Sequence, residues 1–202
     1  MNNYALMLAA ARQHFLEYDI HRLSRRSGVT DLGTCLHTRF CGEEVLVEKT
    51  TGNVTVGGRE ANFVEGLSIY DWLCDRRPDA VAAEVFCTVS SLPGVLVGGS
   101  GLMMRASRLA NMIDKAPKTF EKCCQILGAT PVPYGDLGVR LEIFPDLPMV
   151  LKFYFSDEEF SPELTFLWDR NTLQFVRYET VYYIAGCLEN RLLQLMQQMS
   201  AE

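Results

Sequence analysis

Acidic side chains are the most prominent residues in this chain that could do chemistry. Asp157, Glu158 and Glu159 follow one another directly after a long apolar run, and Asp136 follows Gly135 in an earlier turn. Neighbouring carboxylates repel one another, so they need solvent or an electropositive partner. If the fold brings the two turns together, their oxygens could bind Ca²⁺ or Mg²⁺, or a cationic partner. The simpler interpretation is a solvated turn that discourages edge pairing of an aromatic-rich strand.

A second group combines thiols with an imidazole. Cys35, His37 and Cys41 lie within seven residues, and thiolate and imidazole ligands suit zinc. The paired spacing of a structural zinc site is missing, and a fourth ligand would have to come from farther away in the chain, from Cys87, His14 or His21. Buried free cysteines on a strand explain the same residues more simply.

A glycine-rich segment is the third candidate. Gly98-Gly99-Ser100-Gly101 separates a predicted strand from a predicted helix that carries Arg105 and Arg108, where an anion would find free N–H groups and the helix dipole. Neither the P-loop ending nor the dinucleotide-binding spacing is present. We therefore interpret the segment as a flexible turn.

The remaining cysteines and histidines give no support for catalysis. Cys123-Cys124 could oxidise as vicinal thiols, but both fall on the apolar face of a predicted helix, where cysteine acts as a small hydrophobe. No Cys-x-x-Cys motif occurs, so the chain should not carry its own iron–sulfur cluster. The three histidines lack a nucleophile motif. Whether the protein is an enzyme stays open, and no cofactor, metal or catalytic residue can be assigned.

Helical periodicity dominates both ends of the chain. Apolar residues from Tyr4 to Tyr18 recur at steps of three and four and predict a helix that ends by Gly28. Asn62 and Glu65 have the spacing of a capping box before a helix over 63–74. Further helices are predicted over 102–113 and around 120–127, and a long amphipathic one over 181–199.

Strand patterns occupy the intervals between these helices. Val45–Val47 and Val54–Val56 flank Gly52-Asn53 and predict a hairpin. Short strands are expected over 85–89 and 95–97, and longer ones over 149–155 and 164–168, before a turn at 169–171. The sequence predicts an α+β fold, a single domain over 1–202, with a mainly antiparallel sheet and amphipathic N-terminal and C-terminal helices.

Composition narrows the classes of partner. The chain has 202 residues, 48% hydrophobic and 22% charged, with a formal net charge of −6. That charge disfavours nucleic acid and anionic membranes, and the densest basic segment, Arg22 with Arg25-Arg26, is short. No apolar run reaches the roughly 20 residues that span a bilayer. The N-terminal segment lacks the basic start of a secretory signal, and seven cysteines without framework spacing favour a cytoplasmic location.

The last third of the chain resembles a known family. Its motifs are Tyr134-Gly135-Asp136, Phe144-Pro145-Asp146-Leu147-Pro148, Asp157-Glu158-Glu159-Phe160, Leu167-Trp168-Asp169 and Glu179 before the final helix. With Leu92-Pro93-Gly94 and the helix over 63–74, they resemble the uncharacterised prokaryotic family called domain of unknown function 3786, over about residues 23 to 193. Two positions depart mildly from the family pattern, Ser156 before Asp157 and Trp168 before Asp169.

The resemblance implies little chemistry. Members occur mainly in anaerobic prokaryotes, and some are fused to an iron–sulfur domain of the corrinoid-protein type, which this chain lacks. The resemblance therefore implies iron–sulfur or corrinoid proteins as partners in trans. No catalytic residues are established for the family, so the ligand-binding candidates are only its polar positions: Asp136, Asp157, Glu158, Glu159, Asp169 and Glu179.

Three functions follow as hypotheses. The favoured one is a non-enzymatic accessory or binding module of anaerobic metabolism that uses the acidic turn as a ligand or partner surface. The second is a divalent-metal enzyme that uses the same carboxylates. The third is a homo-oligomer without a small-molecule site, with the final helix as its interface.

Overall fold

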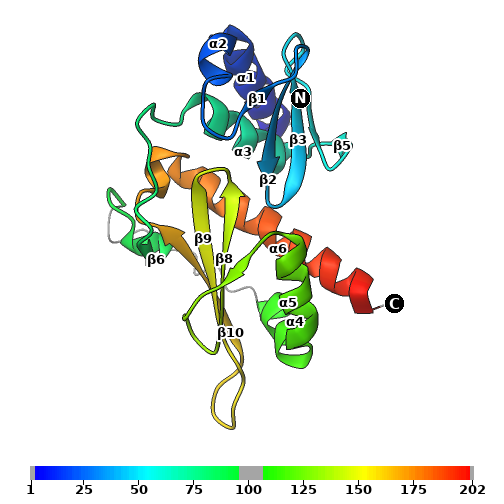
Figure 1. Ribbon diagram of the computed structural model, residues 1–202, viewed down its shortest axis with the longest axis vertical. Coiled ribbons are helices and arrows are strands. Elements are labelled where there is room, and N and C mark those ends of the chain that lie inside the picture. The colour runs from blue at the N-terminus through cyan, green and yellow to red at the C-terminus, as the bar shows by residue number, and fades with distance from the viewer. Residues whose placement is uncertain (1–2, 96–106, 201–202) are drawn as a thin grey trace.

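The protein has an α+β fold, as the sequence predicts. The computed structural model describes residues 3–95 and 107–200 and contains two five-stranded antiparallel sheets with helices packed against them (Figure 1). One cluster of buried hydrophobic side chains includes residues of both sheets. The single-domain organisation stays a prediction.

The first sheet is a meander of five strands in the order of the chain. These are β1 (Thr30–Asp31), β2 (Cys35–Phe40), β3 (Glu43–Glu48), β4 (Val54–Val56) and β5 (Arg59–Glu60). The predicted hairpin is confirmed, because Val45 pairs with Val56 and Val47 with Val54. The turn between β2 and β3 is formed by Cys41 and Gly42, both at positive φ (48° and 80°), as a two-residue hairpin turn of this kind requires.

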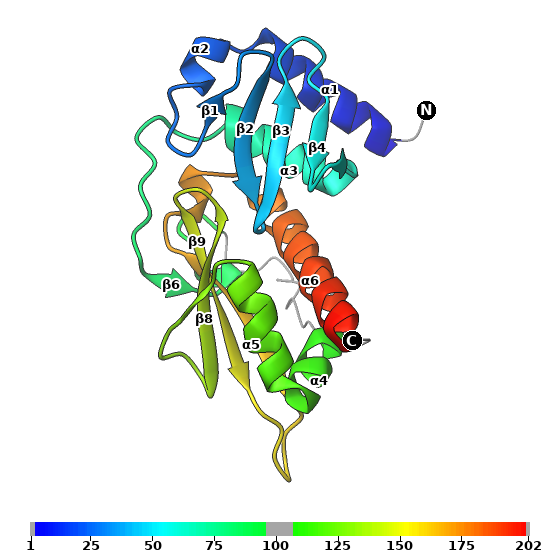
Figure 2. The same ribbon diagram turned by 45° about the vertical axis from the view of Figure 1, so that its right-hand side comes forward.

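Helices α1 (Asn3–Glu17) and α3 (Phe63–Cys74) pack against this sheet and against each other (Figure 2). The prediction for the first helix is only partly right. Of its predicted apolar face only Phe15 is fully buried, and the helix ends at Glu17 rather than near Gly28. A separate turn, α2 (Ile20–Leu23), follows because the side chain of Asp19 accepts the N–H of His21 and caps it.

The capping box of α3 is confirmed and gives the first testable prediction. Asn62 accepts the N–H groups of Val64 and Glu65, and the Glu65 carboxylate accepts the N–H of Asn62. We expect Asn62→Ala to lower the free energy of unfolding by about 1 kcal/mol, and Asn62→Asp to change it little, because aspartate caps equally well. Urea denaturation followed by circular dichroism measures both. Equal losses in the two variants would contradict the capping role.

The second sheet has the order β6-β10-β9-β8-β7. Its strands are β6 (Phe86–Cys87), β7 (Thr130–Pro131), β8 (Leu137–Phe144), β9 (Leu147–Tyr154) and β10 (Glu163–Asp169). β8 is a strand that the sequence analysis did not identify, although Val139, Leu141 and Ile143 alternate with polar residues. It pairs along most of β9 with a bulge between Glu142 and Phe144, which accommodates Pro148 opposite Glu142.

Three helices complete this layer: α4 (Ser107–Lys115), α5 (Pro117–Ile126) and α6 (Tyr178–Ser200). Two single turns of 3₁₀ helix, η1 (Val89–Ser91) and η2 (Thr172–Gln174), precede α4 and α6 in the chain. The first part of the predicted helix over 102–113 and most of the strand over 95–97 lie outside the described residues. α6 has 23 residues, about 34 Å at 1.5 Å per residue, and it contacts both α3 and α5 (Figure 2). The long final helix is therefore confirmed, and it packs against both layers.

Three stacked rings join the layers. Phe144 of β8 stacks on Phe40 of β2, with ring centroids 4.6 Å apart, and on Trp72 of α3, at 4.8 Å. A backbone hydrogen bond from Cys41 N–H to the carbonyl of Ile143, 2.8 Å long, lies beside them. Since these side chains are all fully buried, the two sheets meet through core packing at this point.

Candidate functional site: a cavity lined by arginines

Five arginines surround one cavity on the side of the molecule where α2 and the segment after α3 lie together. The cavity has a volume of about 420 Å³ and is lined by Tyr18, Ser27, Pro78 and five guanidinium groups, those of Arg22, Arg25, Arg26, Arg76 and Arg77. We call it the arginine cavity. No acidic side chain is among the described residues that line it.

Three of these arginines come from α2 and the turn that follows it. Leu23 and Val29 are buried and anchor the segment to the core, which leaves Arg22 and Arg25 exposed. Arg26 is held in place, since its Nη2 donates to the Tyr18 hydroxyl at 3.0 Å and its guanidinium lies 5.6 Å from the centre of that ring. One arginine of the segment is thus oriented, and two remain solvated.

Arg76 is the buried member of the set. Its guanidinium stacks 4.9 Å from the ring centre of Phe175 and 5.6 Å from that of Trp72, and its Nη2 lies 3.3 Å from an oxygen of Asp146. Burial lowers the pKa of Arg76 from its usual range, and the positive charge of Arg26 acts in the same direction against the effect of Asp146. An anion in the cavity would offset this repulsion.

The other three guanidinium groups have unused hydrogen-bonding capacity. Arg22, Arg25 and Arg77 are exposed, and no hydrogen bond or ion pair joins their side chains to another described residue. The backbone N–H of Arg77 donates to the carbonyl of Gln174, which holds this residue beside the cavity. Planar guanidinium groups bind phosphate and carboxylate oxygens in pairs, so this arrangement suits an anion with several oxygens.

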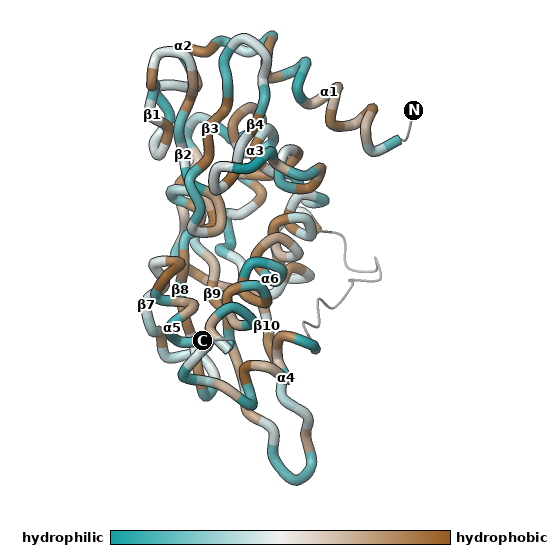
Figure 3. The backbone as a smooth tube through the Cα atoms, turned by 90° about the vertical axis from the view of Figure 1, so that its right-hand side faces the viewer, coloured by the Kyte–Doolittle hydropathy of each residue, from teal (hydrophilic) through white to brown (hydrophobic). Residues whose placement is uncertain are grey.

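The acidic turn is elsewhere, at the end of the β9–β10 hairpin, which projects from the body as a hydrophilic tip (Figure 3). Asp136, Asp157, Glu158 and Glu159 are all exposed there. Asp136 accepts the N–H of Phe155, and Asp157 accepts those of Glu159 and Phe160, which lowers the pKa of Asp157. The base of the turn is held by Asp114 of α4, which accepts the N–H and hydroxyl of Ser156. Asp157 therefore binds the backbone of its own turn, and Asp136, from the turn before β8, binds the backbone where the acidic turn begins.

Asp169 and Glu179 lie apart from that turn. Asp169 is completely buried and accepts three backbone N–H groups, from Ala83 (3.0 Å), Glu84 (2.7 Å) and Asn171 (2.8 Å). These bonds hold the segment before β6, where Glu84 has a φ of 52°, against the end of β10. The geometry thus gives Asp169 a structural role, because its carboxylate binds the backbone of both segments.

Glu179 is exposed and lines another cavity, of about 460 Å³, between α1, α3 and the start of α6. Asp71 lies in its wall and accepts the N–H of Arg177 at 2.7 Å, while Arg177 Nε lies 3.2 Å from its other oxygen. Burial raises the pKa of Asp71 to about 6, and the neighbouring Asp75 carboxylate adds to the effect. Arg177 also pairs with Asp75, so Asp71 and Asp75 share a cationic partner.

The thiols and imidazoles do not assemble into a metal site. In the part of the chain that the structure describes, no three His, Cys, Asp or Glu side chains are grouped to hold a metal ion. His37 instead pairs with Glu44, Cys41 is buried at the β2–β3 turn, and Cys123 and Cys124 are buried as the sequence predicts. The glycine-rich segment over 98–101 lies outside the described residues.

The arginine cavity is the feature that the sequence analysis missed. The two segments that supply its arginines can be recognised in the sequence. One is the basic segment around Arg25, and the other is the pair Arg76-Arg77, which follows a predicted helix. What the sequence does not show is that they adjoin: the side chain of Arg76 donates to the carbonyl of Ser27, 49 residues away in the chain. The formal net charge of −6 gives no indication of this cavity, because net charge averages over the whole surface, whereas these positive groups are concentrated at one place.

The fold and this cavity define a class of protein. In this class two antiparallel sheets share one long helix, and a cationic cavity lies beside the first sheet. The chain belongs to the family described as domain of unknown function (DUF3786), whose model matches residues 19–191 and includes every arginine of the cavity. No curated protein and no solved structure matches the chain. Among the described residues, no helix is long and apolar enough to cross a membrane.

Proposed function

We propose that the protein is a ligand-binding module that takes a small anion with two or more negative charges, such as a diphosphate group, in the arginine cavity. The supporting observation is that two distant segments bring five guanidinium groups to one cavity, while the chain as a whole has a formal net charge of −6. Positive charge gathered at one place on an acidic protein favours an anionic ligand at that place.

The size of the cavity favours a small molecule. At about 30 Å³ for each water-sized position, 420 Å³ gives room for roughly fourteen non-hydrogen atoms. A diphosphate group fits that space and offers enough oxygens to engage Arg22, Arg25 and Arg77 together. A nucleic-acid polymer would extend beyond the cavity over the rest of a protein whose formal net charge is −6, which disfavours it as the ligand.

The proposal extends to an accessory role in anaerobic metabolism, with iron–sulfur or corrinoid proteins as partners in trans. The resemblance to the family supports this part, and no contact in the structure bears on it. A binding module of this kind requires no catalytic residue. The acidic turn, exposed and projecting from the body, is the surface we propose for such a partner.

Calorimetric titration with sodium diphosphate at low ionic strength tests the ligand. We expect saturable binding, weaker binding of monophosphate, and a rise in melting temperature with diphosphate concentration, because a ligand of the native state stabilises it. Replacing Arg22 and Arg25 together by glutamine should weaken binding by about tenfold or more for each residue, the loss typical of a charge-assisted hydrogen bond. Both side chains are exposed, so the fold should be unaffected.

The matched control is Arg170→Gln, which removes an exposed arginine directly after β10, in the other layer. This variant should bind diphosphate like the unmodified protein. Equal affinities in the control and in the double variant would overturn the assignment of the site. No binding of diphosphate by the unmodified protein would overturn the ligand class.

A further inference from the structure

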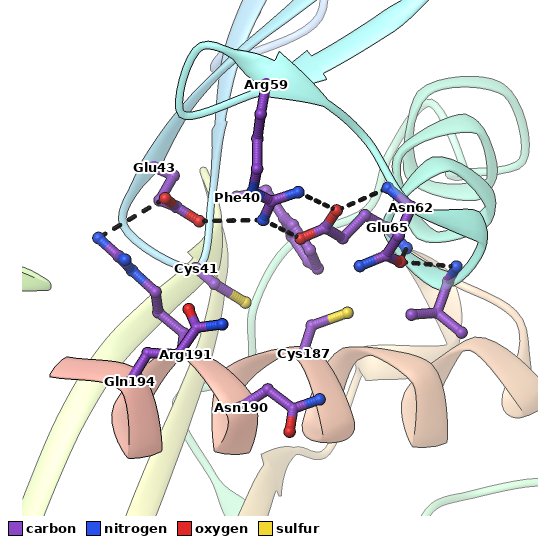
Figure 4. A pocket seen from close by; sticks show the side chains of 11 residues that line it. Phe40, Cys41, Glu43, Arg59, Asn62, Glu65, Cys187, Asn190, Arg191 and Gln194 are labelled. Atoms are coloured by element: carbon purple, nitrogen blue, oxygen red, sulfur yellow. Dashed lines mark hydrogen bonds and ion pairs between the residues drawn. The ribbon is translucent and has the colours of Figure 1, made fainter. Parts of the chain in front are cut away.

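A third cavity lies between the first sheet and α6, where side chains from β2–β3, the β5–α3 connection and α6 converge (Figure 4). Its volume is about 200 Å³. Four charged side chains line it, Glu43, Arg59, Glu65 and Arg191, and it shares no residue with the arginine cavity. The four formal charges cancel, so the cavity has no net charge to offer a ligand.

One ion pair in this cavity is complete. Arg59 binds Glu65 through two parallel hydrogen bonds, of 2.8 and 2.6 Å, and one oxygen of Glu65 also accepts the N–H of Asn62. These contacts use both oxygens of Glu65, as Figure 4 shows. The pair therefore forms a fixed wall and belongs to the capping box of α3.

The other pair is incomplete. Glu43 and Arg191 are only 16% and 25% exposed, yet their closest approach is 3.6 Å, beyond an ordinary hydrogen bond. Arg59 is no closer to Glu43, at 3.9 Å. No hydrogen bond joins either side chain to a described residue, and the buried Nε of Arg191 has no partner. Both ion pairs are longer than hydrogen bonds, so Glu43 and Arg191, which line the cavity, keep hydrogen-bonding capacity for a ligand.

Two amides extend this unsatisfied surface. Asn190 and Gln194 lie on the same face of α6 as Arg191 and line the cavity, and neither forms a side-chain hydrogen bond with another described residue. Each offers both a donor and an acceptor. The side chains available to a ligand are thus the acceptor Glu43, the donor Arg191, and two amides that can each donate and accept a hydrogen bond.

We propose that this cavity is a second binding site, for a small uncharged molecule with a carboxamide group. The N–H of the ligand donates to Glu43 and its carbonyl accepts from Arg191. Neighbouring nitrogen and oxygen atoms of one amide match two groups 3.6 Å apart. An ammonium group is less suitable, because Arg59 and Arg191 flank Glu43 on both sides and would repel it. At about 30 Å³ for each water-sized position, the 200 Å³ of the cavity suits roughly seven non-hydrogen atoms.

Three molecules of nearly identical shape test the ligand class: propionamide, propionate and propionamidinium, which are neutral, anionic and cationic. Titration of ¹⁵N-labelled protein, followed at the Arg191 Nε–H resonance, should show saturable shifts with propionamide and at least tenfold weaker effects with the two ions. Binding of either ion as tight as that of propionamide would overturn the inference. Absence of any shift with propionamide would do the same.

Two neighbouring glutamates give matched variants. Glu43→Gln removes the acceptor charge in the cavity, and propionamide affinity should fall about tenfold, as expected when a hydrogen bond to a charged group is lost. Glu44→Gln changes an exposed residue that faces His37 and Arg39 instead, and should leave affinity unchanged. Equal affinities in the two variants would exclude Glu43 from the site. Binding of diphosphate by Glu43→Gln, measured in parallel, separates this outcome from failure of the arginine cavity.

Discussion

Replacing Asp169 by alanine is expected to lower the free energy of unfolding by about 4 kcal/mol. The carboxylate is completely buried and accepts the N–H groups of Ala83, Glu84 and Asn171. A hydrogen bond to a charged group contributes about 1.5–3 kcal/mol, and the three losses are not fully additive. Guanidinium denaturation followed by tryptophan fluorescence measures the change, since Trp168 precedes the mutated residue.

Two variants control this experiment. Asp169→Asn keeps one acceptor oxygen and should lose about half as much stability. Asp157→Ala removes a carboxylate that also accepts backbone N–H groups, but in an exposed turn where water replaces it, so we expect no measurable change. If Asp169→Ala were as stable as Asp157→Ala, the segment before β6 would not depend on the buried carboxylate.

The second large effect is a dependence of stability on pH that originates at Asp71. Its pKa is raised from 3.8 to about 6, so between these values the folded protein holds a proton that the unfolded chain releases. The stabilisation from this proton is fully present below about pH 4 and is lost as the pH rises through about 6. A shift of this size corresponds to about 3 kcal/mol.

Asp71→Asn tests this dependence, because asparagine resembles the protonated acid and still accepts the N–H of Arg177. At pH 4 the variant and the unmodified protein should be equally stable. At pH 7.5, well above the pKa of about 6, the variant should be more stable by up to about 3 kcal/mol. Urea denaturation across this range gives the comparison, with Glu159→Gln as a control for the loss of an exposed charge. A constant difference between Asp71→Asn and the unmodified protein at every pH would contradict the assignment.

Local patterns explain why much of the fold could be predicted. The capping box of Asn62 and Glu65, the hairpin around Gly52 and the periodicity of α6 each depend on residues a few positions apart. The N-terminal helix was predicted less well. Its apolar stripe is real, but Tyr4 is 58% exposed, and Phe15 is the buried residue of this helix.

The candidate site depends on contacts that local patterns do not contain. Asp169 was identified as a polar family position, yet its hydrogen bonds to residues about 85 positions earlier could not be read from its neighbours. The same applies to Arg76 and Ser27 in the arginine cavity. Whether Glu43 and Arg191 form a hydrogen bond depends on a few tenths of an ångström in the distance between them, and no sequence pattern predicts that distance.

The position of α6 has a consequence for how the chain acquires its structure. This helix follows the ten strands that the structure describes, yet its buried side chains, such as Ile184 and Leu192, belong to the hydrophobic cluster that runs through both sheets. During synthesis, part of the core of each sheet therefore stays uncovered until residues 178–200 have been made. Until α6 has been made, the nascent chain therefore exposes apolar surface that chaperones can bind.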